Sequence, residues 1–231
     1  MKRFEQTLDR IDSTLANMTN RVDVIRGFYD QSNMKACYLQ TLRLEETAER
    51  LTLFARSLPV YTGARTAPED VAQIIRDTIP VQIGFTVEGW FCLRIPLLLP
   101  KKAAGSVNYI RGFLFQALSE FFRDKPPVQY RDCVIVLRHV YDRSFPERQW
   151  RDHDNIEIKL VIDAAALYVL PDDGPKNCCH YYCSDADDSE RTELYIVPRE
   201  EFPKWLAKQK TIPDGGVALY ENYPISAEKD M

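Results

Sequence analysis

The sequence lacks both an N-terminal secretory signal and an apolar run long enough for a membrane span. Its first residues, MKRFEQTLDRIDSTLANM, carry charges where a signal peptide would have its apolar core. The apolar run IPLLLP at 95–100 is far too short to cross a bilayer. We therefore expect a cytoplasmic protein without membrane contact, in which the six cysteines stay reduced thiols.

The sequence also lacks two pairs of zinc ligands that lie apart from each other along the chain. The candidate ligands Cys178, Cys179, His180 and Cys183 fall within six residues, and no second pair follows at a distance. In a strand, Cys178 and Cys179 would point to opposite faces. The pattern favours packed strand cysteines, with a structural zinc site as the alternative.

The chain has no overall basic excess, since its formal net charge is −4. This argues against a protein that coats nucleic acid nonspecifically. The distribution is uneven, however: residues 94–151 contain eleven Lys and Arg against five acids, a local balance of +6. An acidic stretch follows directly. Basic surface beside clustered carboxylates is typical of an enzyme that holds a phosphodiester and cuts it with a metal ion, and an ordinary mixed-charge surface is the alternative.

The first eighty residues predict helices. Apolar residues recur there at three- and four-residue steps, which indicates one helix face. A second helix is expected over 34–58, and a third from 67 to just before Pro80. We expect a helical extension over 1–80 that packs on the next domain or on a protein partner, a main domain over 81–210 and a tail over 211–231. The stripe of the first helix consists of Leu8, Ile11, Leu15, Met18, Val22 and Ile25.

From Val81 the hydrophobic period changes to two, which indicates strands. Two strands flank Glu88–Gly89 as a hairpin, and the last two, separated by the acidic turn DADDSE, are expected to form a closing hairpin. The order ββαβαββ predicts an α+β fold with a mixed sheet. The other expected elements are a helix over 109–122, a strand over 132–141, a helix over 156–170 capped by Asp154–Asn155, strands over 178–183 and 192–197, and a short helix near 198–209.

The stretch RDHDNIEIKLVIDAAALYVLPDD at 151–173 brings many carboxylates together. Asp152 and Asp154 are two residues apart, so they share one side of an extended segment. Lys159 and Asp163 are four apart on one helix face. Helix caps and a Pro-Asp-Asp-Gly turn explain these residues one by one. Taken together, carboxylates from two segments suit Mg²⁺, and a lysine beside them suits the negative charge of a phosphate being cut.

These residues resemble the signature of the RusA family of Holliday-junction resolvases: Asp-x-Asp-Asn, a lysine four residues before an aspartate, then an Asp-Asp turn. RIPLLLPKKAAGSVNYIRG, DCVIVLRHVYDRSFPERQWRD and TELYIV are similar to further segments of that family, so the resemblance covers about residues 90–198. It implies a RusA-like fold and a homodimeric, Mg²⁺- or Mn²⁺-dependent endonuclease of a phage or other mobile element that cuts branched DNA.

The resemblance assigns metal binding to Asp152, Asp154 and Asp173, with Asp172 in support, and transition-state stabilisation to Lys159. The family's lysine falls at the position of Ile158, whereas Lys159 keeps the four-residue distance to Asp163. One extra residue at the helix start, or a π-bulge, would restore its direction. The alternative is an inactive RusA-like fold that serves in binding or assembly. Backbone phosphates are expected to contact Lys101, Lys102, Arg111, Arg143, Arg148 and Arg151.

Overall fold

The computed structural model describes residues 2–102, 106–126, 128–144 and 151–224. Contacts divide the chain into two compact units, Met1–Ile74 with Ala103–Tyr109 and Ile75–Lys102 with Ile110–Met231. The division falls within α3 (Ala67–Thr78). No helix in the described parts of the chain combines the length and apolarity needed to span a membrane.

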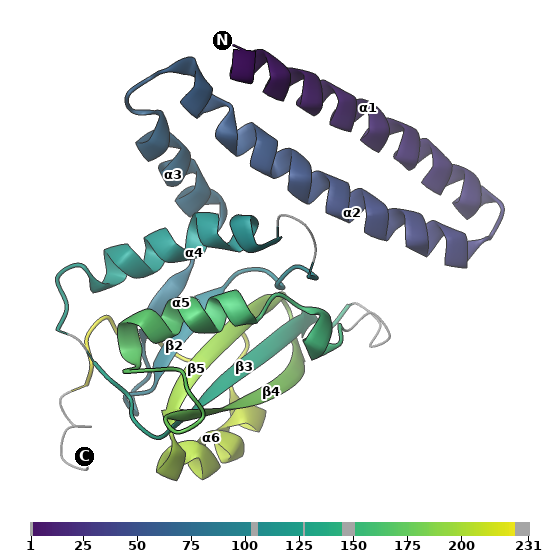
Figure 1. Ribbon diagram of the computed structural model, residues 1–231. Helices are drawn as coiled ribbons and strands as arrows, with labels where there is room; N and C mark the ends of the chain where they lie inside the picture. The colour runs from purple at the N-terminus through teal and green to yellow at the C-terminus, as the bar shows by residue number, and fades with distance from the viewer. Residues whose placement is uncertain (1, 103–105, 127, 145–150, 225–231) are drawn as a thin grey trace. The chain divides into compact units, whose positions relative to one another are not determined.

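The first unit is built on an antiparallel pair of helices, α1 (Lys2–Asp30) and α2 (Met34–Ser57), followed by the 3₁₀ turn η1 (Pro59–Thr62) (Figure 1). Asn33 caps α2, because its side-chain oxygen accepts a hydrogen bond from the backbone N–H of Ala36 at 3.2 Å. The guanidinium of Arg21 donates to the side-chain oxygen of Gln40 at 2.8 Å and fixes the register of the pair. The predicted helical N-terminal region is confirmed.

The second unit contains a five-stranded mixed sheet in the order β1-β2-β5-β3-β4. The hairpin across Glu88–Gly89 is confirmed, as is the α+β class with element order ββαβαββ. The pair β3–β4 is parallel and the remaining pairs are antiparallel. The strands are β1 (Gln82–Phe85), β2 (Phe91–Ile95), β3 (Cys133–Asp142), β4 (Cys178–Asp187) and β5 (Arg191–Pro198).

The expected closing hairpin is wrong. Strands β4 and β5 are joined by a short turn, yet β3 lies between them and pairs with both. The burial of β3 explains this position: every residue of Cys133–Tyr141 is buried, and a strand that is buried on both faces belongs inside a sheet. Strand β4, with its exposed and polar residues, takes the edge of the sheet.

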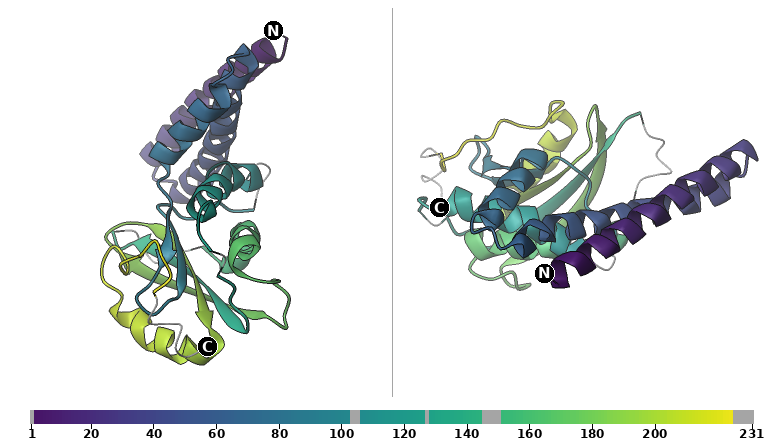
Figure 2. Two further views of the ribbon diagram at one scale, coloured as in Figure 1. Left: turned by 90° about the vertical axis from the view of Figure 1, so that its left-hand side faces the viewer. Right: turned by 90° about the horizontal axis from the view of Figure 1, so that it is seen from above.

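Helices cover both faces of the sheet (Figures 1 and 2). On one face lie α4 (Ser106–Phe122) and α5 (Lys159–Val169), and on the other lies α6 (Phe202–Lys208) after the turn η4 (Arg199–Glu201). The α6 face contains a core cluster around Trp205, which is 1% exposed and packs with Trp90, Val136 and Tyr195. Since side chains alternate along a strand, the neighbouring residues Ile135 and Leu137 face the α4/α5 layer.

One further expectation is corrected. The helix expected from the Asp154–Asn155 cap begins only at Lys159, because Ile156 is extended and the segment 155–157 pairs with residues 100–102. The described part of the predicted tail, 212–224, packs against the sheet unit. Tyr220 exchanges backbone hydrogen bonds of 2.8 Å with Phe85, and Val217 and Leu219 pack against the α6-face cluster.

Candidate metal and phosphate site

Backbone pairing brings the basic and acidic stretches of the sequence side by side. The N–H of Lys102 donates to the carbonyl of Asn155 at 2.9 Å, and the N–H of Glu157 donates to the carbonyl of Pro100 at 3.0 Å. The fully buried side chain of Ile156 anchors this segment. The ammonium of Lys102 also donates to the backbone carbonyl of Asp154 at 2.6 Å. Residues fifty positions apart therefore share one surface.

A groove of about 460 Å³ lies where α5 passes the edge strand β4. Three aspartates from three segments line it: Asp154 from the turn η3 (His153–Asn155), Asp163 from α5, and Asp173 from the loop after α5. The chain after α5 therefore turns back toward the Asp-His-Asp turn, as a shared site requires. The remaining lining residues are Lys102, His153, Ile156, Ile158, Lys159, Ile162, His180 and Tyr182.

Lys159 is the first residue of α5 and reaches into this groove. Helix α5 is a regular α-helix over Lys159–Val169 and contains no π-bulge. Its ammonium donates to both carboxylate oxygens of Asp163, at 2.9 and 2.8 Å. The hydrogen bond to Asp163 raises the pKa of Lys159, with Asp173 adding to the effect. Lys159 is therefore a fixed positive charge at neutral pH and cannot serve as a base.

Asp154 and Asp173 are exposed, and neither carboxylate has a hydrogen-bond partner among the described residues. Free carboxylates from two segments are ligands that Mg²⁺ or Mn²⁺ would accept. They do not converge tightly: within the described residues, Asp152, Asp154 and Asp173 are not a set whose oxygens all lie within 4.8 Å. One Mg²⁺ could therefore bind only part of this set directly, with water molecules completing its coordination shell.

The other two predicted acids lie outside the groove lining. Asp152 is exposed and precedes η3, where its backbone carbonyl accepts a hydrogen bond from the N–H of Asn155 at 3.1 Å. Asp172 belongs to the Asp-Asp-Gly turn, and its carboxylate accepts a hydrogen bond of 3.5 Å from the side-chain amide of Asn177. Both positions fit a role in the local turn.

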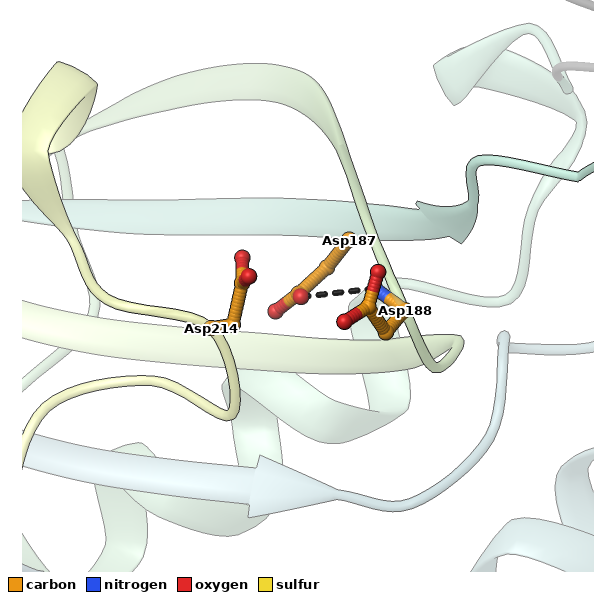
Figure 3. Close-up of side chains that lie close together, drawn as sticks. All are labelled: Asp187, Asp188 and Asp214. Carbon is orange, nitrogen blue, oxygen red and sulfur yellow. Dashed lines mark hydrogen bonds between the residues drawn. The ribbon is translucent and has the colours of Figure 1, made fainter.

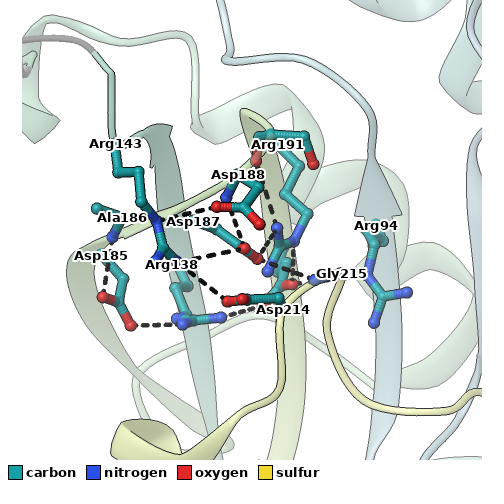
Figure 4. Close-up of polar contacts among 12 residues, drawn as sticks. Arg94, Arg138, Arg143, Asp185, Ala186, Asp187, Asp188, Arg191, Asp214 and Gly215 are labelled. Atoms are coloured by element: carbon teal, nitrogen blue, oxygen red, sulfur yellow. Dashed lines mark hydrogen bonds and ion pairs between the residues drawn. The ribbon is translucent and has the colours of Figure 1, made fainter.

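A tighter group of carboxylates, Asp187, Asp188 and Asp214, lies on the other face of the sheet (Figure 3). Arginines already neutralise it (Figure 4). Arg191 contacts Asp187 at 2.5 Å, and Arg143 lies 3.0 to 3.7 Å from all three acids. Burial opposes the ionisation of Asp187, but the N–H groups of Asp188 and Gly215 and the Arg191 guanidinium hold its pKa below the ordinary range. This group is a structural ion-pair network and needs no metal ion.

The three histidines of the chain lie beside the groove. The ring of His153 contacts the hydroxyl of Ser184 at 3.1 Å and stacks between the rings of His139 and Tyr182. His139 is fully buried, and neither of its ring nitrogens has a partner in the described structure. Burial, with His153 and Arg151 adding to it, lowers the pKa of His139 to about 3, so its ring is neutral. No role for His153 is predicted from the sequence. Its position between two aspartates is the one feature of the sequence that points to this site.

The structure places some of the predicted phosphate-binding residues near the groove and others away from it. Lys101 and Lys102 lie beside the Asp-His-Asp turn, and Arg111 is exposed on α4. Arg143 is held by the aspartates on the other face of the sheet, away from the groove. Arg151 donates from its guanidinium to the carbonyl of Leu99 at 2.5 Å and so ties two loops together. Arg148 lies outside the described residues.

The cysteines form no metal site in the described part of the chain. Cys178 is buried and Cys179 is exposed, as expected for neighbours in a strand. No three of the four candidate zinc ligands come within coordination distance there. Burial raises the pKa of Cys183 to about 12, which keeps it a thiol.

The comparisons with known proteins identify a family but not a function. Residues 1–223 match the model of a family of unknown function, DUF6100, so the chain belongs to that family. The match includes the N-terminal helices as well as the sheet. No curated protein and no solved structure matches the chain.

Proposed function

We propose that this member of the DUF6100 family is a metal-dependent endonuclease of the RusA type, acting on branched DNA. The observation that supports this most is the groove, in which two carboxylates without a hydrogen-bond partner among the described residues, Asp154 and Asp173, face two lysines, Lys102 and Lys159. Carboxylates attract a divalent cation and lysines attract a phosphate. A site for both ligands is what metal-assisted phosphodiester hydrolysis requires.

The chain's own residues have distinct parts in this proposal. Asp154 and Asp173 would hold the metal ion, which when bound activates water and neutralises phosphate charge. Lys102 stands at the basic edge of the groove and would position a backbone phosphate. Lys159 is fixed by Asp163 as a positive charge and would stabilise the charge that develops on the phosphate. His153, placed by Ser184, faces the same space.

The contrast with the Asp187 group explains why the looser set is the better metal site. Each carboxylate of that group has an arginine within 3.7 Å, so a cation would have to displace an existing ion pair. Among the described residues, Asp154 and Asp173 have no such arginine, so a cation could bind them without displacing an ion pair.

Metal binding is the first test. Mn²⁺ at about a hundredfold excess over its dissociation constant should stabilise the fold by about 2.7 kcal/mol. For a chain of this size that corresponds to a rise in Tm of roughly 5 to 10 °C. Asp154→Asn and Asp173→Asn should each remove most of this rise. Asp172→Asn is the matched control, because Asp172 adjoins Asp173 but does not line the groove; it should behave like the unaltered protein.

Cleavage is the second test. A labelled four-way junction, a linear duplex and a flap are incubated with the protein in Mg²⁺ or Mn²⁺. Cutting should depend on metal and disappear in Asp173→Asn, whereas Lys159→Met should lose cutting but keep the metal-induced rise in Tm. Asp152→Asn distinguishes between two assignments of the metal ligands. The RusA pattern includes Asp152 among them, whereas the residues that line the groove do not include it. If the protein neither gains stability from metal nor cuts any substrate, the fold serves binding or assembly instead.

A further inference from the structure

The first helix carries an uninterrupted heptad stripe. Apolar or aromatic residues recur along α1 at alternating four- and three-residue steps through the whole helix, which is the pattern of a helix–helix seam. The residues are Phe4, Leu8, Ile11, Leu15, Met18, Val22, Ile25 and Tyr29. Within Lys2–Asp30, all of which the structure describes, none of these is buried, and Thr7 is the one buried residue.

Helix α2 covers only one side of this stripe. The α1 residues that α2 shields are half-buried or buried and recur at alternating three- and four-residue steps. The series begins with Phe4, Thr7, Ile11 and Thr14. The contacts of Arg21 with Gln40 and of the Cys37 thiol with the Ile25 carbonyl mark this side. On the adjoining side Val22 is half-buried, whereas the other three positions of the stripe stay open: Leu8 is 37%, Leu15 46% and Tyr29 64% exposed.

The pair of helices therefore buries little by itself. In Met34–Ser57, also fully described, Cys37 is the one buried residue. Helices gain most of their stability from burying an amphipathic face, and α2 covers only part of the apolar stripe of α1. Next to the open Tyr29, the exposed side chains of Met34 and Tyr38 extend the apolar surface around the turn between the helices.

The residues beside the exposed part of the stripe indicate which kind of partner binds there. The positions beside the seam and away from α2 are Glu5, Asp12, Thr19 and Arg26, seven residues apart and all exposed. The first half of this flank is acidic and its last position is basic. A second copy of α1 running antiparallel would place Glu5 of each copy near Arg26 of the other. A parallel copy would place like charges together, which costs stability.

We propose that two copies of the chain associate through antiparallel α1 helices, so that the two helix pairs form a four-helix bundle. The stripe is complementary to itself in this orientation, because Leu8 then faces the Ile25 end and Leu15 faces the centre of the partner helix. Arg26 has a neighbour on its own helix, Asp23 at 3.1 Å, but both side chains are more than 60% exposed. Such a surface pair is weak and can be exchanged for Glu5 of the second copy.

Leu15→Glu and Val24→Glu provide a matched test. Leu15 is 46% and Val24 45% exposed, and their separation of nine positions amounts to two and a half helical turns, so they lie on opposite sides of α1. Sedimentation equilibrium should find the full chain dimeric at micromolar concentrations. Leu15→Glu should raise the dimer dissociation constant at least about tenfold, while Val24→Glu should leave it unchanged. Circular dichroism of each variant checks that the helices are intact.

Charge exchange tests the orientation and the identity of the partner. Glu5→Arg alone and Arg26→Glu alone should each weaken the dimer, and the double variant should restore it. A monomeric wild type, a dimer that Leu15→Glu does not affect, or equal effects of Leu15→Glu and Val24→Glu would overturn the proposal. The proposal is independent of the metal site, since Asp173→Asn should leave the dimer unchanged.

Discussion

Replacing Glu193 by glutamine tests whether a buried ion-pair network holds the sheet together. Glu193 is fully buried on β5, and its carboxylate accepts hydrogen bonds from the guanidinium of Arg138 at 2.9 Å, that of Arg191 at 2.6 Å and the hydroxyl of Tyr195 at 3.0 Å. Burial opposes its ionisation, but Arg138 and Arg191 outweigh burial and lower the pKa of Glu193.

The magnitude follows from what the arginines lose. Removing one partner of a buried ion pair costs about 3 to 5 kcal/mol, because the other charge stays buried and unpaired. Here Arg138 keeps Asp185 and Arg191 keeps Asp187, so the lower end of this range applies. We expect Glu193→Gln to lower the free energy of unfolding by about 3 kcal/mol. For a protein of this size the Tm should fall by roughly 6 to 12 °C.

Urea unfolding followed by tryptophan fluorescence is the assay, since Trp90 and Trp205 lie in the core of the sheet unit. Glu190→Gln serves as the control: it removes the same charge from an exposed position of the neighbouring turn and should change stability by less than about 0.5 kcal/mol. A loss below about 1 kcal/mol for Glu193→Gln would refute the reasoning, because such a value is typical of solvated pairs.

Three further predictions concern the same unit. Because the pKa of Glu193 is lowered on folding, its contribution is present above the unfolded value and is lost as pH falls through the folded one; urea midpoints should decline below about pH 4, and less so in Glu193→Gln. Gly216→Ala should cost about 2 kcal/mol in the same unfolding assay, since φ is +89° and the new methyl group would meet the Arg94 guanidinium, whereas Gly215→Ala, with open space around it, should cost less. Trp205→Ala should lower the free energy of unfolding by about 4 kcal/mol, and a loss under 2 kcal/mol would contradict its place in the core.

Local sequence patterns predicted most of the secondary structure. The heptad steps of α1 and the period-two runs around Glu88–Gly89 and in β3 predict the observed elements, because helix and strand periodicity depends on residues a few positions apart. The clustering of Asp154, Lys159 and Asp173 in the sequence also pointed to one surface, and the structure places all three along one groove. Their roles remain predictions.

The ion-pair network shows a signal that sequence reasoning missed. Arg138 interrupts the apolar run CVIVLRHVY and Glu193 interrupts TELYIV, and a charge inside a buried strand needs a partner. The partner could not be named without the register, which sets Arg138 directly opposite Glu193. The same network holds the segment around Gly215, which lies in the C-terminal tail predicted over 211–231.

What the sequence by itself determined is the kind and order of the elements, the stripe on α1 and the set of candidate ligands. Tertiary structure alone decided that β3 separates β4 from β5, that Asp187 is neutralised by arginines, and that Asp154 and Asp173 are not, among the residues described. The physical reason is range. Periodicity is set by neighbours along the chain, whereas strand order and charge pairs such as Arg138 with Glu193 join residues far apart in the sequence, through register and burial that no local pattern encodes.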